Sequence, residues 1–245
     1  SLAPRVRFEE REIVFQQDCV LILRCPDESD MMQLTEGACL VSMLHYPTNP
    51  RRTEFIRSLG VNAISIDSIV DDDGIRLVEN MRAVAWNGLE TAFKALAENY
   101  PEPGFESPLR KPIQVTLMGS GMVGMQVLPA AIRYGKPARW RKFAAEGLVG
   151  VQLVAVDYDT TAHELIMLDL LSRTDILVDA TQRPDPTHSI IRNHWIGVMP
   201  RHAVLLDLSV DPYERGNPEG NVKGIEGMPH GNLDQFVFQP DDPNW

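Results

Sequence analysis

The sequence predicts an α/β protein of two doubly wound domains with a cleft between them. Short runs rich in β-branched residues and leucine alternate with segments whose apolar residues recur at helical spacing. This alternation is typical of parallel strands joined by right-handed crossovers. A stretch with four prolines over residues 99–112 divides the 245 residues. We therefore expect a first domain over residues 1–108 and a second over 109–245.

Three apolar runs in the first half predict strands over residues 19–23, 39–44 and 61–66. Between the last two, a helix over residues 51–59 is expected to end at Gly60. After an acidic turn, residues 79–99 predict a long helix with an apolar stripe along one face. We expect this helix to link the two domains.

The second half repeats the alternation. The expected strands cover residues 115–118, 151–156, 175–180 and 203–208, and the expected helices cover residues 123–134, 162–172 and 189–196. Residues 136–147 are interpreted as an insertion between the first of these helices and the second strand. In sheets of this kind, ligands bind beyond the carboxyl ends of the strands.

The first strand of the second half runs directly into three glycines at positions 119, 121 and 124. This spacing between a buried strand and a helix is typical of Rossmann-like dinucleotide-binding domains, because it allows a tight turn, a close phosphate and close helix packing. The helix N-terminus adds free N–H groups for the anion. The predicted cofactor-binding residues here are Gly119, Ser120, Gly121, Met122, Val123 and Gly124. The alternative is a glycine turn in an α/β protein that binds no nucleotide.

Asp157 follows the second strand of this half, where an acidic side chain would accept hydrogen bonds from the adenosine ribose and repel a 2′-phosphate. This position favours NAD over NADP, although its distance from the glycines exceeds the usual spacing of about 20 residues. Asp159 is an alternative ribose ligand. Tyr158, beside Asp157, and Thr181, after the third strand, are also expected to contact the cofactor.

Composition narrows the function classes. A net charge of −11 argues against nucleic acid and anionic membrane surfaces as partners. No run approaches the length of a membrane span, and the first residues lack a signal-peptide pattern. The three cysteines have no histidine at metal-ligand spacing, so we expect free thiols in a reducing cytoplasm and no metal site.

Several segments, in order, resemble the alanine dehydrogenase and NAD(P) transhydrogenase N-terminal domain family, which includes saccharopine dehydrogenase-like members. The similar segments lie at residues 23–26 (Leu-Arg-Cys-Pro), 42–46 (Ser-Met-Leu-His-Tyr), 80–86, 206–211 and 227–229. Residues 71–76 and 210–218 lean toward the saccharopine branch. The family's first strand–helix unit and its C-terminal helices have no counterpart here, so we expect a truncated first domain.

The resemblance implies an NAD-dependent oxidoreductase that acts on the CH–NH2 or CH–NH group of an amino acid, with an amino acid or 2-oxo acid as its small-molecule substrate. It implies catalytic roles for His45 and Asp211, a substrate-binding role for Arg24 and a cofactor contact for Met228. It also implies a homo-oligomer built on the dinucleotide-binding domains.

One residue departs from the family. Arg24 stands where the family has a lysine, and an arginine cannot lose its proton to act as a base. It could still bind a substrate carboxylate through two parallel hydrogen bonds. The alternative function is therefore an NAD-binding regulatory or transhydrogenase-type module with little dehydrogenase activity of its own.

Overall fold

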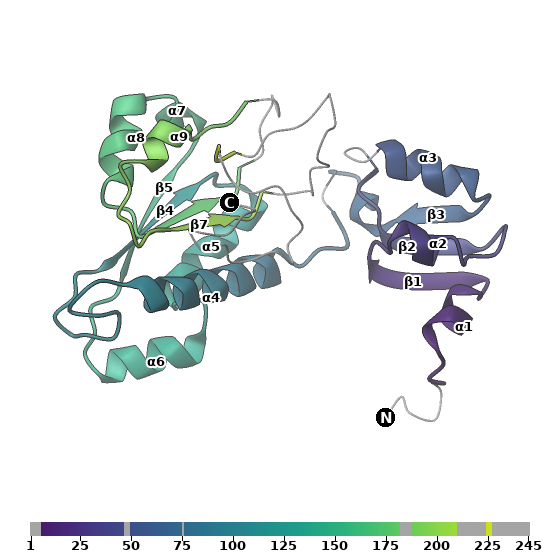
Figure 1. The fold of residues 1–245 in the computed structure, drawn as a ribbon, viewed down its shortest axis with the longest axis horizontal. Coiled ribbons are helices and arrows are strands. Elements are labelled where there is room, and N and C mark those ends of the chain that lie inside the picture. Colours follow the sequence, from purple (N-terminus) through teal and green to yellow (C-terminus); the bar gives the residue numbers. More distant parts are fainter. Residues whose placement is uncertain (1–5, 47–49, 75, 182–187, 210–223, 227–245) are drawn as a thin grey trace. The chain divides into compact units, whose positions relative to one another are not determined.

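The computed structural model describes residues 6–46, 50–74, 76–181, 188–209 and 224–226 (Figure 1). By packing, the chain divides into two compact units, Ser1–Glu79 and Asn80–Trp245. Each unit contains a parallel sheet connected by helices, so the predicted α/β class is confirmed. The predicted cleft between the halves stays a prediction.

Unit 1 is built on three parallel strands in the order β1-β2-β3. The strands are β1 (Cys19–Arg24), β2 (Cys39–Met43) and β3 (Asn62–Ser65), and the helices are α1 (Arg11–Phe15), α2 (Glu28–Met31) and α3 (Pro50–Ser58). A 3-10 turn, η3 (Ile66–Ser68), follows β3. The α2 helix was not predicted; its N-cap is Asp27, which accepts a hydrogen bond from the N–H of Asp30 at 2.9 Å.

The core of unit 1 lies on one face of this sheet. Val20 and Leu40 are buried there with apolar side chains from all three helices. The next residues along β1 on the other face, Leu21 and Leu23, are 72% and 65% exposed. The connections from β1 to β2 and from β2 to β3 both lead to the next strand on the same side of the sheet. Right-handed crossovers therefore place both connecting helices, α2 and α3, on one face. The prediction of a doubly wound fold is therefore wrong for the described part of this half.

Unit 2 carries a four-stranded parallel sheet in the order β5-β4-β6-β7. Its elements are α4 (Met81–Asn99), β4 (Ile113–Met118), α5 (Met122–Ile132), α6 (Pro137–Ala145), β5 (Val151–Val156), α7 (Tyr158–Thr161), α8 (Glu164–Leu171), β6 (Ile176–Asp179), α9 (Asn193–Ile196) and β7 (Val204–Asp207). The chain moves outward from β4 to β5 and then returns past β4 to β6, so this sheet is doubly wound, as predicted. The interpreted insertion forms helix α6.

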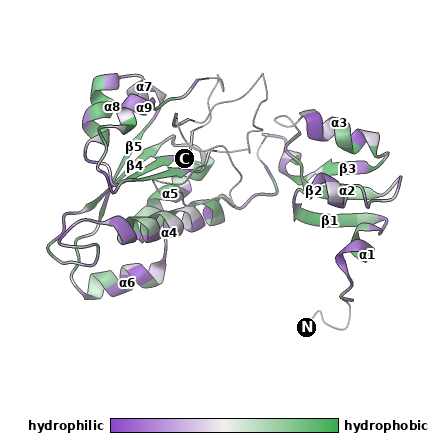
Figure 2. Cartoon of the chain, in the orientation of Figure 1, coloured by the Kyte–Doolittle hydropathy of each residue, from purple (hydrophilic) through white to green (hydrophobic). Residues whose placement is uncertain are grey.

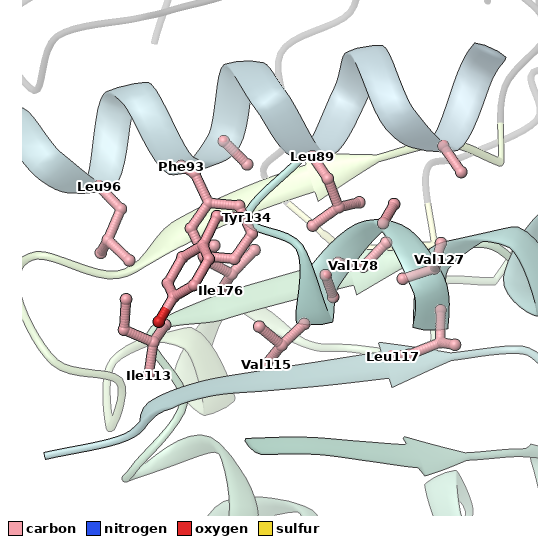
Figure 3. Close-up of a cluster of buried hydrophobic side chains, with 14 of the residues drawn as sticks. Leu89, Phe93, Leu96, Ile113, Val115, Leu117, Val127, Tyr134, Ile176 and Val178 are labelled. Atoms are coloured by element: carbon pink, nitrogen blue, oxygen red, sulfur yellow. The ribbon is translucent and has the colours of Figure 1, made fainter. Parts of the chain in front are cut away.

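Two apolar cores cover the two faces of the second sheet. Val115 and Leu117 of β4 point to one face and pack with Leu89 and Phe93 of α4 (Figure 3). Met118 points to the other face and packs with residues of α8 and α9. The strands carry mostly hydrophobic residues, as burial on both sides requires (Figure 2). Over the described residues, no helix combines the length and the hydropathy that crossing a bilayer would need.

The boundary between the units lies earlier than predicted, between Glu79 and Asn80 rather than near residue 108. Helix α4 belongs to unit 2 because its apolar stripe packs against α5 and the sheet. The proline-rich stretch is no linker either. Phe105 is 6% exposed, and the buried Arg110 donates hydrogen bonds to the carbonyl of Phe105 at 2.7 Å and the hydroxyl of Tyr134 at 3.0 Å. These contacts hold the stretch against the core.

Candidate functional site

The glycine turn begins at the carboxyl end of β4. Gly119 has a φ of +87°, and its N–H donates to the carbonyl of Val156 at 3.0 Å. A Cβ at this position would lie 2.7 Å from the carbonyl oxygen of Ala180. The turn therefore fits between the ends of β5 and β6 only with glycine at position 119. It lies at the switch point of the sheet, where ligands bind in doubly wound folds.

The other two glycines meet different surroundings. A Cβ at Gly124 would lie 2.1 Å from the carbonyl oxygen of Gly119, so the first turn of α5 crosses the loop in contact with it. Gly121, the N-cap of α5, has no heavy atom within 4 Å of the position its Cβ would take. Two glycines are thus required by the protein's own packing, and Gly121 borders open space. The N–H groups of the first turn, including those of Met122 and Val123, have no partner within an α-helix.

Asp157 connects the end of β5 to the glycine turn. Its carboxylate accepts hydrogen bonds from the N–H of Ser120 at 3.2 Å and the Ser120 hydroxyl at 2.5 Å. The other carboxylate oxygen accepts the N–H of Tyr158 at 2.8 Å and caps α7. The Ser120 hydroxyl, followed by the Tyr158 N–H, lowers the pKa of Asp157. The carboxylate is therefore ionised at neutral pH beside the turn, while the Tyr158 side chain is exposed.

A second aspartate, which lies within the predicted strand over residues 175–180, is the last residue of β6. Asp179 is fully buried and accepts hydrogen bonds from the N–H and the hydroxyl of Thr181, at 3.0 and 2.6 Å. A Cβ at Gly224 would lie 2.0 Å from its Oδ2 atom. Asp179 thus fixes the backbone beside Gly119. The signal in the sequence is an acidic residue at the end of an otherwise apolar run, followed by a threonine.

In unit 1, the carboxyl ends of the strands bring His45 and Asp67 together. His45, after β2, has a φ of +50°, and its Nδ1 lies 3.4 Å from Oδ2 of Asp67. Asp67 also accepts the N–H of Leu44 at 3.0 Å and the Ser65 hydroxyl at 2.6 Å. Burial raises the pKa of Asp67, but the Ser65 hydroxyl and His45 together lower it by more. The pKa of Asp67 therefore lies below its ordinary value. The ionised carboxylate orients the imidazole, a role that the sequence did not assign to Asp67.

Arg24 is exposed at the end of β1, and Met43 of β2 is its neighbour in the sheet. Unit 1 therefore presents Arg24 and His45 at the same edge of its sheet. Unit 2 brings together the glycine turn, Asp157 and Thr181. The remaining predicted site residues, Asp211 and Met228, lie outside the described residues.

A cavity of about 380 Å³ lies elsewhere in unit 2, among the helices α4, α5 and α6. It contains none of the predicted site residues; its lining residues are Arg82, Trp86, Gln126, Pro129, Arg133 and Pro137. The candidate site therefore rests on the geometry of the glycine turn and not on this cavity.

The doubly wound sheet with a glycine turn at its switch point defines unit 2 as a Rossmann-like fold. Among solved structures, the chain is similar to an L-alanine dehydrogenase, with a TM-score of 0.60, 15% identity, and coverage of 91% of this chain and 62% of that one. It is also similar to a transhydrogenase from Sinorhizobium meliloti, with a TM-score of 0.52, 16% identity, and coverage of 89% and 64%. No protein-family model and no curated protein sequence matches the chain.

These two structures agree with the family that the sequence resembles, and they confirm that resemblance at the level of fold. The chain spans less than two thirds of the length of either. At such low identity the similarity establishes architecture alone.

Proposed function

We propose that the chain binds NAD at the glycine turn of unit 2 and belongs to an NAD-dependent oxidoreductase. The observation that carries the proposal is the distribution of space at the turn. Gly119 and Gly124 are crowded by protein atoms, and Gly121 faces open space at the N-terminus of α5. A pyrophosphate approaching that backbone would meet the free N–H groups and the positive end of the helix dipole.

Asp157 supports NAD in particular. Its pKa is lowered by the Ser120 hydroxyl, so it carries a negative charge where an adenosine ribose would lie. Each carboxylate oxygen has two lone pairs, so Oδ1, which accepts the Tyr158 N–H, can also accept a ribose hydroxyl while Oδ2 holds Ser120. The 2′-phosphate of NADP would be repelled by this charge.

For the reaction, we propose hydride transfer from the α-carbon of an amino acid, in an enzyme similar to alanine dehydrogenase or saccharopine dehydrogenase. The bound nicotinamide would supply the hydride acceptor. His45, oriented by Asp67 at 3.4 Å, would hold and return the proton as a general acid and base. Arg24 would bind the substrate carboxylate, and Asp211 would assist at the reacting nitrogen.

Arg24 also favours the alternative, an NAD-binding regulatory or transhydrogenase-type module. The side chain is a permanent cation and cannot replace a lysine that must give up its proton. A chain of this kind would bind NAD without turning over an amino acid.

Two measurements separate these functions. The first is the melting temperature with NADH and with NADPH, where NADH should give the larger rise. The second is NADH oxidation with pyruvate, glyoxylate or 2-oxoglutarate and with ammonia or lysine. His45→Ala should abolish turnover and leave the NADH shift intact, and His163→Ala, an exposed histidine on unit 2, serves as the matched control. Binding without turnover would support the module, and no response to either nucleotide would refute both functions.

A further inference from the structure

Two cysteines lie side by side at the start of neighbouring strands in unit 1. Cys19 begins β1 and Cys39 begins β2, and their Cα atoms are direct partners in the parallel pairing. The N–H of Cys39 donates to the carbonyl of Asp18 at 2.8 Å, which fixes this register. Side chains alternate along a strand, and Val20 and Leu40 face the core. Both cysteine side chains therefore lie on the opposite face of the sheet.

The spacing of the two residues suits a disulfide. Neighbouring strands lie about 4.8 Å apart, and a disulfide needs Cα atoms roughly 4.4–6.8 Å apart. Both thiols are free, Cys19 is exposed and Cys39 is half-buried, so a reagent can reach them. Burial and then the adjacent Cys19 thiol raise the pKa of Cys39, and a hydrogen bond between the two thiols contributes to the shift.

We propose that Cys19 and Cys39 form a reversible disulfide that links β1 to β2. The oxidant is a low-molecular-weight disulfide. The Cys19 thiolate attacks one of its sulfurs, which breaks that S–S bond, forms a mixed disulfide and releases one small thiol. The Cys39 thiolate then attacks Sγ of Cys19 and releases the second small thiol. Two protein thiols are oxidised, one small disulfide is reduced, and the two protons pass to the released thiols.

Cys25, the third cysteine, is an internal control for the reaction of Cys19 with Cys39. It follows the other end of β1, and its thiol donates to the carbonyl of Pro26 at 3.4 Å. Cys19 and Cys39 begin their strands, so neither thiol lies beside Cys25 to close a disulfide with it. It should remain a thiol while the pair reacts.

The bond would join the strands at the edge opposite His45 and Asp67, because those residues follow the carboxyl ends of the strands. It would close a loop that contains α2 and so restrict the unfolded chain. The expected consequence is a more stable unit 1 with an unchanged histidine site.

The test is to incubate the reduced chain with glutathione disulfide, block the remaining thiols after denaturation, and measure the intact mass. The wild type should carry one blocking group, on Cys25, whereas the reduced protein carries one on each of its three cysteines. The oxidised protein should melt about 5 °C higher, and dithiothreitol should reverse the change.

Cysteine variants control the assignment. Cys25→Ser should form the same bond, while Cys19→Ser and Cys39→Ser should stop at a glutathione adduct or not react. A mass that shows three blocked thiols, stable mixed disulfides on both cysteines of the wild type, or only disulfides between chains would overturn the proposal. Because each serine variant removes one exposed or half-buried sulfur, its circular dichroism checks that the fold is kept.

Discussion

Gly121→Ala separates a structural glycine from one that makes room for a ligand. Gly121 has a φ of −67°, which alanine adopts without strain, and no heavy atom lies within 4 Å of the added Cβ. Neither of the other two glycines in the turn allows this substitution, because their Cβ atoms would lie 2.7 Å and 2.1 Å from carbonyl oxygens. The change at Gly121 therefore perturbs only what enters the open space.

Two opposing effects on stability nearly cancel at this position. Alanine is a poorer N-cap than glycine by about 0.5 kcal/mol, and restriction of the unfolded chain recovers a similar amount, about 0.4–1 kcal/mol. The melting temperature should therefore change by no more than about 2 °C. A methyl group against a pyrophosphate would instead cost one charge-assisted hydrogen bond, about 1.5–3 kcal/mol. NADH should therefore bind about 10- to 150-fold more weakly.

The assay is a titration of the full chain with NADH, followed by intrinsic tryptophan fluorescence or calorimetry, together with a thermal melt. Gly150→Ala is the matched control, because Gly150 also has open space around its Cβ and lies before β5, at the opposite edge of the sheet. Unchanged NADH affinity in Gly121→Ala would show that the turn is a structural feature and refute the proposed cofactor site. A large drop in the melting temperature of Gly121→Ala would show that other atoms of the protein occupy the space around the added Cβ.

Three further substitutions test the remaining contacts. Asp157→Asn should lower the preference for NADH over NADPH about tenfold, by loss of a charged acceptor, and Asp159→Asn, measured by the same titrations, should leave it unchanged. Asp67→Asn should destabilise the protein by about 1–3 kcal/mol at pH 7. Folding lowers the pKa of Asp67, so its ionised carboxylate stabilises the wild type at every pH above the unfolded pKa of about 3.9. This contribution is lost as the pH falls below that value and through the lower pKa of the folded state. Urea denaturation should thus show the two proteins converging as the pH falls below about 3.9, and a constant gap would contradict the pKa argument. Arg110→Met should cost about 2–4 kcal/mol by leaving buried acceptors unpaired, whereas a change below about 0.5 kcal/mol in the same measurement would mean that the proline-rich stretch is a linker after all.

The regular elements of unit 2 could be predicted because local patterns determine them. The β5 strand has the predicted bounds, and β4 and α5 begin within two residues of theirs. The boundary between the units could not be predicted in the same way. Prolines indicate irregular backbone, but whether that backbone is a linker depends on Phe105 and Arg110 being buried against residues distant in sequence.

In the candidate site, too, local sequence patterns predict some features, while others depend on residues distant in sequence. The roles of the glycines follow from their spacing, and the structure gives each of them different surroundings. The partnership of His45 with Asp67 was not predicted, because it depends on two strands ending at the same edge of a sheet. The single winding of unit 1 also depends on strand order, which periodicity does not encode.

Each sheet has a buried aspartate near the carboxyl end of a strand, Asp179 as the last residue of β6 and Asp67 just after β3, but the two carboxylates have different partners. Asp179 is enclosed by Thr181 and by the backbone at Gly224, so its contacts serve to hold the loops around the glycine turn. Asp67 also holds backbone N–H groups, but its second oxygen faces the ring of His45, which is 24% exposed. Through this contact, Asp67 connects the interior of its sheet to a ring that can exchange protons with solvent. The pair in unit 1 therefore suits the proposed proton transfer, and the open turn in unit 2 suits the proposed cofactor.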